Sequence, residues 1–384
     1  MFEKTNEDWD CRAISPEFLA KFCKDGDYYP FVTLVEKHSE LQLCFRGNDY
    51  LDKIPLKGGK VCIYVYNHAM FTITPDKLYI NPNYLRYCKD WRKIKEELLE
   101  EYGFNNGKDI NPDVKKNKMY SSSFSNNQIS VNLTKDFIKN KLNGLYELLK
   151  RVFNDFFSEE KDKCVDRFLK WNNDHNKKYI NKIPPKDYEN NKKKKLEKKR
   201  QQELFCIMQD QKDGYYFYDM EFQQKHKDKD ELKAEIERGT SNKPDMQAIR
   251  FGKDGKPEAI VFVEVKCTKS AYSGEKSGLD KHVKAMLQYS EEELVRRRRE
   301  AYMILHQYEK LGLRQFERKI DWREYTDLPL EIILVFTDEA IDIWKRKVDL
   351  GDIKFDWIQL DNNKLLPDGE KFEIVKVDKM HFDN

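Results

Sequence analysis

The chain has 384 residues, of which 39% are hydrophobic and 36% charged, and its formal net charge is +3. This length exceeds one ordinary hydrophobic core and favours two domains. The small net charge excludes a uniformly basic surface, so contact with nucleic acid has to come from local basic patches. The eight cysteines have no CxxC spacing, the opening sequence is acidic, and no apolar run reaches membrane-spanning length. We therefore expect a cytoplasmic protein with reduced cysteines, without a signal peptide and without a membrane partner.

The first 170 residues predict an α+β domain whose fold the sequence does not identify. Residues 30–84 contain short β-branched or aromatic runs separated by polar breaks, which is typical of strands. These runs are FVTLV, LQLCF, KVCIYVY and MFTIT.

Helical patterns follow these strands. The segment 89–103 predicts a helix that ends at Gly103, and residues 104–130 are rich in Asn, Ser, Lys and Gly, as loops are. From about Thr134 an amphipathic pattern predicts a helix. Its Phe-rich stripe indicates packing in a core or against another subunit.

A polar and basic stretch at 171–195 contains Pro184-Pro185 and favours a linker between domains. The pattern changes after it. A helix, three strands, a long helix from about residue 279 and a strand at 330–338 follow in that order, which predicts a mixed α/β domain over 196–384.

Residues 243–268 predict a buried β-hairpin. The run AIVFVEVKCT is almost continuously apolar, as in a strand buried on both faces, and the Asp-Gly pair at 254–255 favours a tight turn. If this pair centres the turn, Asp245 and Glu264 face each other with Cβ atoms about 4.5–5.5 Å apart. Lys266 lies two residues beyond Glu264 and therefore on the same face.

Two opposed carboxylates at the end of a buried strand repel each other. A divalent cation between them would remove that cost, and carboxylate oxygens suit Mg²⁺ or Mn²⁺. A lysine beside the cation can orient a water and stabilise charge developing on a phosphate. The arrangement predicts metal-assisted phosphodiester hydrolysis.

The motif formed by Pro244-Asp245 and Glu264-Val265-Lys266 resembles the signature of the PD-(D/E)XK nuclease superfamily. The resemblance covers the C-terminal half of the chain only. It implies a restriction-endonuclease-like mixed sheet flanked by helices. It also implies catalytic roles for Asp245, Glu264 and Lys266, with the Val265 carbonyl joining the two acids as a metal ligand.

Acid-x-Lys triplets recur at 113–115, 231–233 and 352–354, as expected by chance in a chain rich in Glu and Lys. Only the copy at 264–266 follows a buried strand joined to Pro-Asp through an Asp-Gly turn. The alternative interpretation is a surface hairpin with an incidental Glu/Lys pair.

Further acids could assist the site. The superfamily often carries an acid on the helix before the hairpin, and Glu203 borders the apolar face of the predicted helix there. The resemblance therefore adds Glu203 to the catalytic candidates, with a solvated helix acid as the alternative. Asp219 and Glu221 share one face of the strand YYFYDMEF and are secondary candidates, for which solvent exposure is favoured.

Basic and polar side chains after the hairpin are candidates for binding nucleic acid, because a small-residue loop and a helix start can hold phosphate. Gln288-Tyr289 resembles the Gln/Tyr motif of RecB-like nucleases, although the two residues are adjacent here. His282 is a further candidate for substrate contact, with a helix-surface histidine as the alternative. The candidates for binding nucleic acid are Lys269, Lys276, Lys281, Lys284, Gln288, Arg296 and Arg297. A solvated charged face is the alternative for the two arginines.

The sequence as a whole predicts a Mg²⁺- or Mn²⁺-dependent endonuclease that cleaves DNA. Two alternatives stay open: a nucleic-acid-binding or assembly protein with a silent nuclease fold, and an effector that cleaves RNA. An unfamiliar N-terminal domain fused to a nuclease resembles bacterial restriction or antiviral-defence effectors. In that case the N-terminal domain would bind a trigger, a partner protein or a second copy of the chain in a homo-oligomer.

Overall fold

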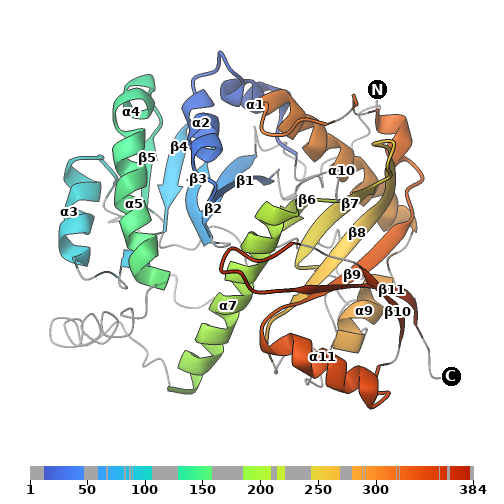
Figure 1. Cartoon of the computed structure of the whole chain (residues 1–384). Helices are drawn as coiled ribbons and strands as arrows, with labels where there is room; N and C mark the ends of the chain where they lie inside the picture. Colours follow the sequence, from blue (N-terminus) through green and yellow to red (C-terminus); the bar gives the residue numbers. More distant parts are fainter. Residues whose placement is uncertain are drawn as a thin grey trace, which may run out of the picture. The chain divides into compact units, whose positions relative to one another are not determined.

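Two β-sheets organise the chain (Figure 1). The computed structural model describes residues 13–46, 59–65, 68–81, 84–85, 88, 90–105, 129–157, 185–208, 214–220, 244–268, 279–287, 289, 291–316, 318–319, 321–353, 355–360 and 364–380. Within these ranges, no helix combines the length and the apolar character that crossing a membrane requires.

The sheets belong to two units that divide the chain discontinuously. The first unit combines Ser15–Cys44 with Lys57–Tyr188, and the second contains Ile14, Phe45 and Arg46 together with the chain from Glu189 onward. Two of the divisions therefore fall inside regular elements, one in strand β1 (Leu41–Arg46) and one in helix α7 (Pro185–Ile207).

The first unit has a five-stranded sheet in the order β1-β2-β3-β4-β5. The pairs from β2 to β5 are antiparallel, which is consistent with an α+β region. Its strands after β1 are β2 (Lys60–Val65), β3 (His68–Ile73), β4 (Lys77–Ile80) and β5 (Ile129–Asn132). Its helices before α7 are α1 (Pro16–Phe22), α2 (Tyr29–Lys37), α3 (Trp91–Glu100), α4 (Lys135–Asn140) and α5 (Leu142–Phe157).

The run FVTLV, expected as a strand, is helical and lies inside α2. Phe31 and Val32 are fully buried, and the Phe31 ring meets those of Phe22 and Phe71 at 6.5 and 6.2 Å between centroids. Packing on the aromatic cluster outweighs the modest strand preference of β-branched residues. The helix expected from about Thr134 does start there, because the Thr134 side chain caps it by accepting a hydrogen bond from Phe137 N.

Helix α7 occupies part of the stretch expected as a linker. Residues 185–195 form its first half, and the rest of the expected linker up to residue 184 lies outside the described residues. The helix continues without a break from this basic stretch through residues 196–207.

The second unit has a six-stranded mixed sheet in the order β10-β11-β9-β8-β7-β6. Strands β8 and β9 are parallel and the other pairs antiparallel, so the expected mixed α/β class is confirmed. The strands are β6 (Tyr215–Met220), β7 (Met246–Phe251), β8 (Pro257–Lys266), β9 (Leu330–Phe336), β10 (Phe355–Leu360) and β11 (Glu373–Met380). Its remaining helices are α9 (Leu279–Leu287), α10 (Glu291–Leu311), the 3-10 helix η4 (Trp322–Tyr325) and α11 (Glu339–Asp349).

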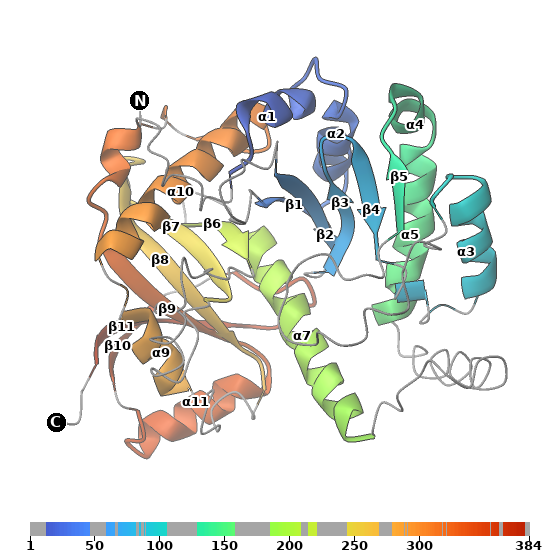
Figure 2. The ribbon, with the colours of Figure 1, turned by 180° about the vertical axis from the view of Figure 1, so that it is seen from behind.

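Helices α9 and α10 replace the single long helix expected from about residue 279, and they cover one face of this sheet (Figure 2). The Tyr289 ring, between the two helices, lies 4.8 Å from that of Phe262 on β8, and Tyr308 OH donates to Tyr218 O on β6 over 3.3 Å. Strand β8 is buried from Ala259 to its end, as expected from its continuous apolar run.

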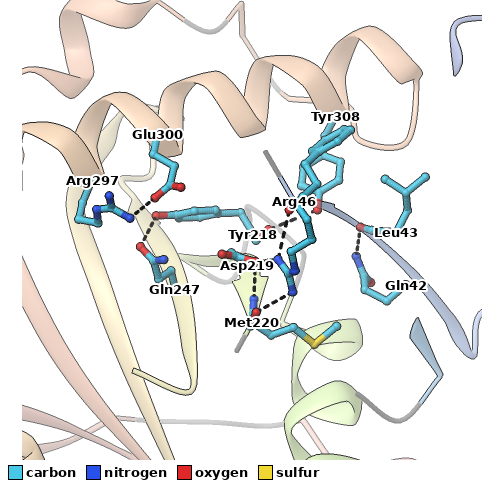
Figure 3. A network of polar contacts seen from close by, with 11 residues as sticks. Gln42, Leu43, Arg46, Tyr218, Asp219, Met220, Gln247, Arg297, Glu300 and Tyr308 are labelled. Carbon is cyan, nitrogen blue, oxygen red and sulfur yellow. Dashed lines mark hydrogen bonds and ion pairs between the residues drawn. The ribbon is translucent and has the colours of Figure 1, made fainter. Parts of the chain in front are cut away.

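Residues from the start of the chain complete this unit. The Gln307 amide on α10 bonds both backbone groups of Ile14, accepting from its N–H at 3.1 Å and donating to its carbonyl at 2.7 Å. Arg46 forms an ion pair with Asp219 on β6 at 2.5 Å and donates to Met220 O at 2.8 Å (Figure 3). The second unit is therefore not a simple C-terminal domain.

Candidate active site

The register of the β7–β8 hairpin is the one expected from the sequence. Pairs from Met246↔Val263 to Arg250↔Ala259 follow it. Extending that register by one residue brings Asp245 opposite Glu264.

The turn differs from the expected two-residue form. Gly255 has a φ of 74°, and Gly252 N donates to Lys256 O across the turn, so three residues form the loop. Glu258 is then an extra residue in β8, since Phe251 pairs with Pro257 while Arg250 pairs with Ala259. The bulge offsets the longer turn, and the two irregularities together restore the expected register at the carboxylates.

Asp245 lies directly before β7, where its carboxylate meets the end of β8. Its Oδ2 accepts a hydrogen bond from Val265 N at 2.8 Å. The residue is partly buried. Burial and the nearby Glu264 raise the pKa of Asp245 well above its ordinary value, against the opposing effect of Lys266.

Glu264 is only 2% exposed, and its two oxygens have different surroundings. Oε1 lies 2.5 Å from Lys266 Nζ and 2.9 Å from His282 Nδ1. Oε2 is buried, and among the described residues nothing forms a hydrogen bond with it. A buried carboxylate oxygen without a donor is costly, so Oε2 calls for a cation or an ordered water.

Lys266 and His282 hold Glu264 in its charged form. Burial alone would raise the pKa of Glu264, but the two basic side chains outweigh it and lower this pKa to about 2. Burial alone would lower the pKa of Lys266, but Glu264 and Asp245 raise it above its ordinary value. The lysine is therefore cationic and the glutamate anionic at neutral pH.

Glu197 of α7, an acid that the sequence did not single out, interacts electrostatically with this site. Burial raises the pKa of Glu197, Glu264 adds to the rise, and Lys266 opposes it. Glu203 is 6% exposed and forms ion pairs with Arg200 at 2.7 Å and Lys199 at 3.4 Å. Its carboxylate is thus engaged by cations of its own helix.

Helical spacing could have identified Glu197. It lies four, seven and eleven residues before Gln201, Leu204 and Met208, all of which are buried, so it extends their stripe along α7. Leu196 and Ile207, the apolar residues seven before and four after Glu203, are both only half-buried.

The candidates for binding nucleic acid separate into four groups, the last of which is Arg297 alone. Lys281 and Lys284 are exposed on α9, as such contacts require. Arg296 is half-buried. Lys269, Lys276 and Gln288 lie outside the described residues.

Arg297 does not fit the expected role. It is 3% exposed and pairs at 2.5 Å with Glu300, which is itself buried (Figure 3). Four consecutive arginines span more than one turn of a helix, so some of them have to face the sheet. Arg298 also turns inward and donates to Leu328 O over 2.7 Å.

Asp219, expected on an exposed face, is 1% exposed and forms an ion pair with Arg46. This ion pair gives the buried carboxylate a structural role. Glu221 lies outside the described residues.

Asp245 and Glu264 suit an oxygen-binding cation such as Mg²⁺ or Mn²⁺, which carboxylates and carbonyls bind. In the described ranges, no three His, Cys, Asp or Glu side chains converge into a metal-binding group. The two acids would therefore need backbone or water oxygens to complete a ligand set, as implied for the Val265 carbonyl. The buried Oε2 of Glu264 is the observation that fits a cation.

No protein-family model matches the chain, and searches of curated proteins and of solved structures find no significant relative. A functional assignment therefore depends on the chain's own residues.

Proposed function

We propose that the second unit is a metal-dependent nuclease that hydrolyses phosphodiester bonds of DNA. The observation that carries the proposal is the buried Glu264 Oε2, which has no donor among the described residues and sits on a sheet edge shared with Asp245 and Lys266. Such an acid, acid and lysine set at the end of a buried hairpin also resembles the PD-(D/E)XK signature. The preference for DNA follows from that resemblance.

Asp245 and Glu264 would hold the cation, because their charges are otherwise only partly compensated. Lys266 interacts with Asp245, Glu264 and Glu197, and the pKa values of Asp245 and Glu197 are nevertheless both raised. The cation would supply Lewis-acid polarisation of the phosphate and a lowered pKa for a bound water.

Lys266 would act on the reacting groups directly. Its pKa is raised, so it stays cationic, and its Nζ lies 2.5 Å from Glu264 Oε1. An ammonium group there can donate to a water and to a phosphate oxygen, and it stabilises negative charge as that charge develops on the phosphate. The exposed Lys281 and Lys284 would bind the phosphate backbone beyond the site.

The test is a cleavage assay with the full chain. Linear, supercoiled and single-stranded DNA and RNA are each incubated with Mg²⁺, Mn²⁺ or EDTA, beside the variants Lys266→Ala and Asp245→Asn. We expect divalent-dependent cleavage of DNA that both variants lose. Cleavage of RNA alone would replace DNA as the substrate.

If the wild-type protein cleaves none of these substrates, calorimetric titration with Mg²⁺ and Mn²⁺ shows whether the site binds metal. Absence of both cleavage and metal binding would overturn the proposal and favour a binding or assembly protein with a silent site. Full activity in Asp245→Asn would also overturn it, because the proposal assigns the metal to that carboxylate.

A further inference from the structure

His282 reaches the site from the helix that follows the hairpin. Leu279, Val283 and Met286 of α9 are buried at the spacing of one helix face, and His282 borders that face. Its side chain is 26% exposed, compared with 2% for Glu264. The histidine is thus the more solvent-accessible member of the contact with the buried carboxylate.

The hydrogen bond between His282 and Glu264 has a defined direction. A carboxylate accepts hydrogen bonds, so His282 Nδ1, 2.9 Å from Oε1, is the donor in this contact. Lys266 Nζ donates to the same oxygen over 2.5 Å. Both donors therefore act on Oε1, and neither acts on Oε2.

Two donors from different elements fix the carboxylate more firmly than one. The terminal torsion of a glutamate is broad, so a carboxylate held by one flexible lysine on its own strand can rotate. The imidazole comes from α9, whose apolar residues anchor it on the sheet. Together they determine which oxygen points away from the basic groups.

We propose that His282 is a positioning residue: by holding Oε1 of Glu264 together with Lys266, it presents the buried Oε2 as the oxygen that binds the cation. This inference rests on the proposed metal-dependent function. It assigns His282 a contact with a metal ligand and not with the substrate. Partners that orient a metal ligand in this way typically contribute 10–100-fold to metal affinity.

The test measures Mn²⁺ affinity of the full chain by calorimetry, with DNA cleavage as a second readout. Three variants accompany the wild type. His282→Ala removes the donor, and His282→Asn keeps one, because the Asn amide nitrogen branches from the same carbon as Nδ1. His306→Ala is the matched control: its Nδ1 lies 3.3 Å from Glu309 on α10 and its side chain is 33% exposed.

We expect His282→Ala to weaken Mn²⁺ binding about 10–100-fold. His282→Asn should recover most of that loss, and His306→Ala should bind as the wild type does. If His282→Asn recovers the Mn²⁺ affinity, the loss in His282→Ala comes from the orientation of Glu264 and not from lost packing. Thermal unfolding without metal measures any loss of packing independently.

The failures are distinguishable. If the wild type binds Mn²⁺ and His282→Ala binds it equally well, the inference is wrong while the proposed function stands. Loss of affinity in His282→Asn as large as in His282→Ala also overturns it, because the donor is then irrelevant. If the wild type binds no Mn²⁺, the inference and the proposed metal-dependent function fail together.

Discussion

The backbone N–H of Val265 donates a hydrogen bond to the Asp245 carboxylate over 2.8 Å. This bond joins the residue before β7 to the end of β8, and it keeps the Asp245 carboxylate beside Glu264 although the two repel each other. An asparagine can keep the bond through its carbonyl oxygen while losing the charge.

Asp245→Asn should therefore separate stability from activity. Because burial and Glu264 raise the pKa of Asp245, ionised Asp245 destabilises the metal-free fold. We expect a higher Tm without metal, by about 2–4 °C for each kcal/mol of relieved repulsion, and metal-dependent cleavage reduced at least about 10²-fold. Thermal scans with and without Mg²⁺ check the first effect, and a lower Tm in the metal-free variant would contradict it.

Lys266→Met should be unstable as well as inactive. It leaves Glu264 buried with His282 as the remaining basic partner, and breaking a buried ion pair costs about 3–5 kcal/mol. Urea unfolding measures the loss. Saturating Mg²⁺ should restore part of it, because bound cation replaces the missing charge. A stability within about 1 kcal/mol of wild type would show that Glu264 is compensated in another way.

Arg200→Ala tests a buried hub that positions α7. Arg200 is 4% exposed and pairs with Glu203, Asp338 and Asp368 at 2.7–2.8 Å. Asp338 precedes α11 with a φ of 50°, which is unusual for a non-glycine residue and needs support from its surroundings.

We expect Arg200→Ala to lower the free energy of unfolding by about 3–5 kcal/mol, because three carboxylates lose the guanidinium group that they share. Lys199→Ala is the matched control: it also contacts Glu203, at 3.4 Å, but its side chain is 34% exposed. The control should cost about 0–1 kcal/mol. Equal losses in chemical denaturation would argue against a structural hub at Arg200.

Acid should weaken the first unit through Glu40. Burial would raise the pKa of this carboxyl, but hydrogen bonds from Lys150 at 2.8 Å and Tyr146 at 2.7 Å lower it from 4.5 to about 2. A lowered acid pKa contributes stability that is complete above pH 4.5 and is lost as the pH falls toward 2.

Glu40→Gln should therefore be less stable than the wild type at pH 7, and the difference should shrink between pH 4.5 and 2. Tm values at pH 7, 4.5 and 3 measure it, with Glu100→Gln, an exposed α3 residue, as the control. A difference that stays constant over this range would contradict a role for the ionised carboxylate.

Arg46→Met should destabilise the second unit although residue 46 is far from it in sequence. The Arg46–Asp219 contact is 2.5 Å long, with side chains 14% and 2% exposed. Arg318–Glu324 has the same length but exposures of 37% and 23%. We expect a loss of about 3–5 kcal/mol for Arg46→Met and at most about 1 kcal/mol for Arg318→Met. Similar losses in the two variants would show that burial does not decide the outcome.

The sequence predicts those parts of the site that depend on local periodicity. Alternation along the hairpin places Glu264 and Lys266 on one face, and the structure keeps that register. It does so through a three-residue turn and a bulge at Glu258. A prediction that assumes a two-residue turn at 254–255 includes neither of these features. The prediction was right because two irregularities compensate.

The structure adds what the sequence does not contain where tertiary contacts select between two local possibilities. FVTLV has strand-forming residues, but it is helical in the structure, where Phe31 packs in an aromatic cluster. Glu197 and Glu203 are both plausible acids on α7, and only the packed helix shows that Glu203 faces Arg200. Arg297 is buried in an ion pair with Glu300. The run of arginines in the sequence does not show which of them forms such a pair.

The attachment of Ile14 and Arg46 to the second unit bears on how the chain is made. Ile14 precedes its partner Gln307 by 293 residues, and Arg46 precedes Asp219 by 173. At about 5–20 residues per second, a ribosome needs roughly 15–60 s between the synthesis of Ile14 and that of Gln307. Ile14 and Arg46 therefore wait for partners that are synthesised much later, and a fragment that begins after Arg46 lacks both residues. The unit that carries the candidate site can therefore close only after Gln307 has been synthesised.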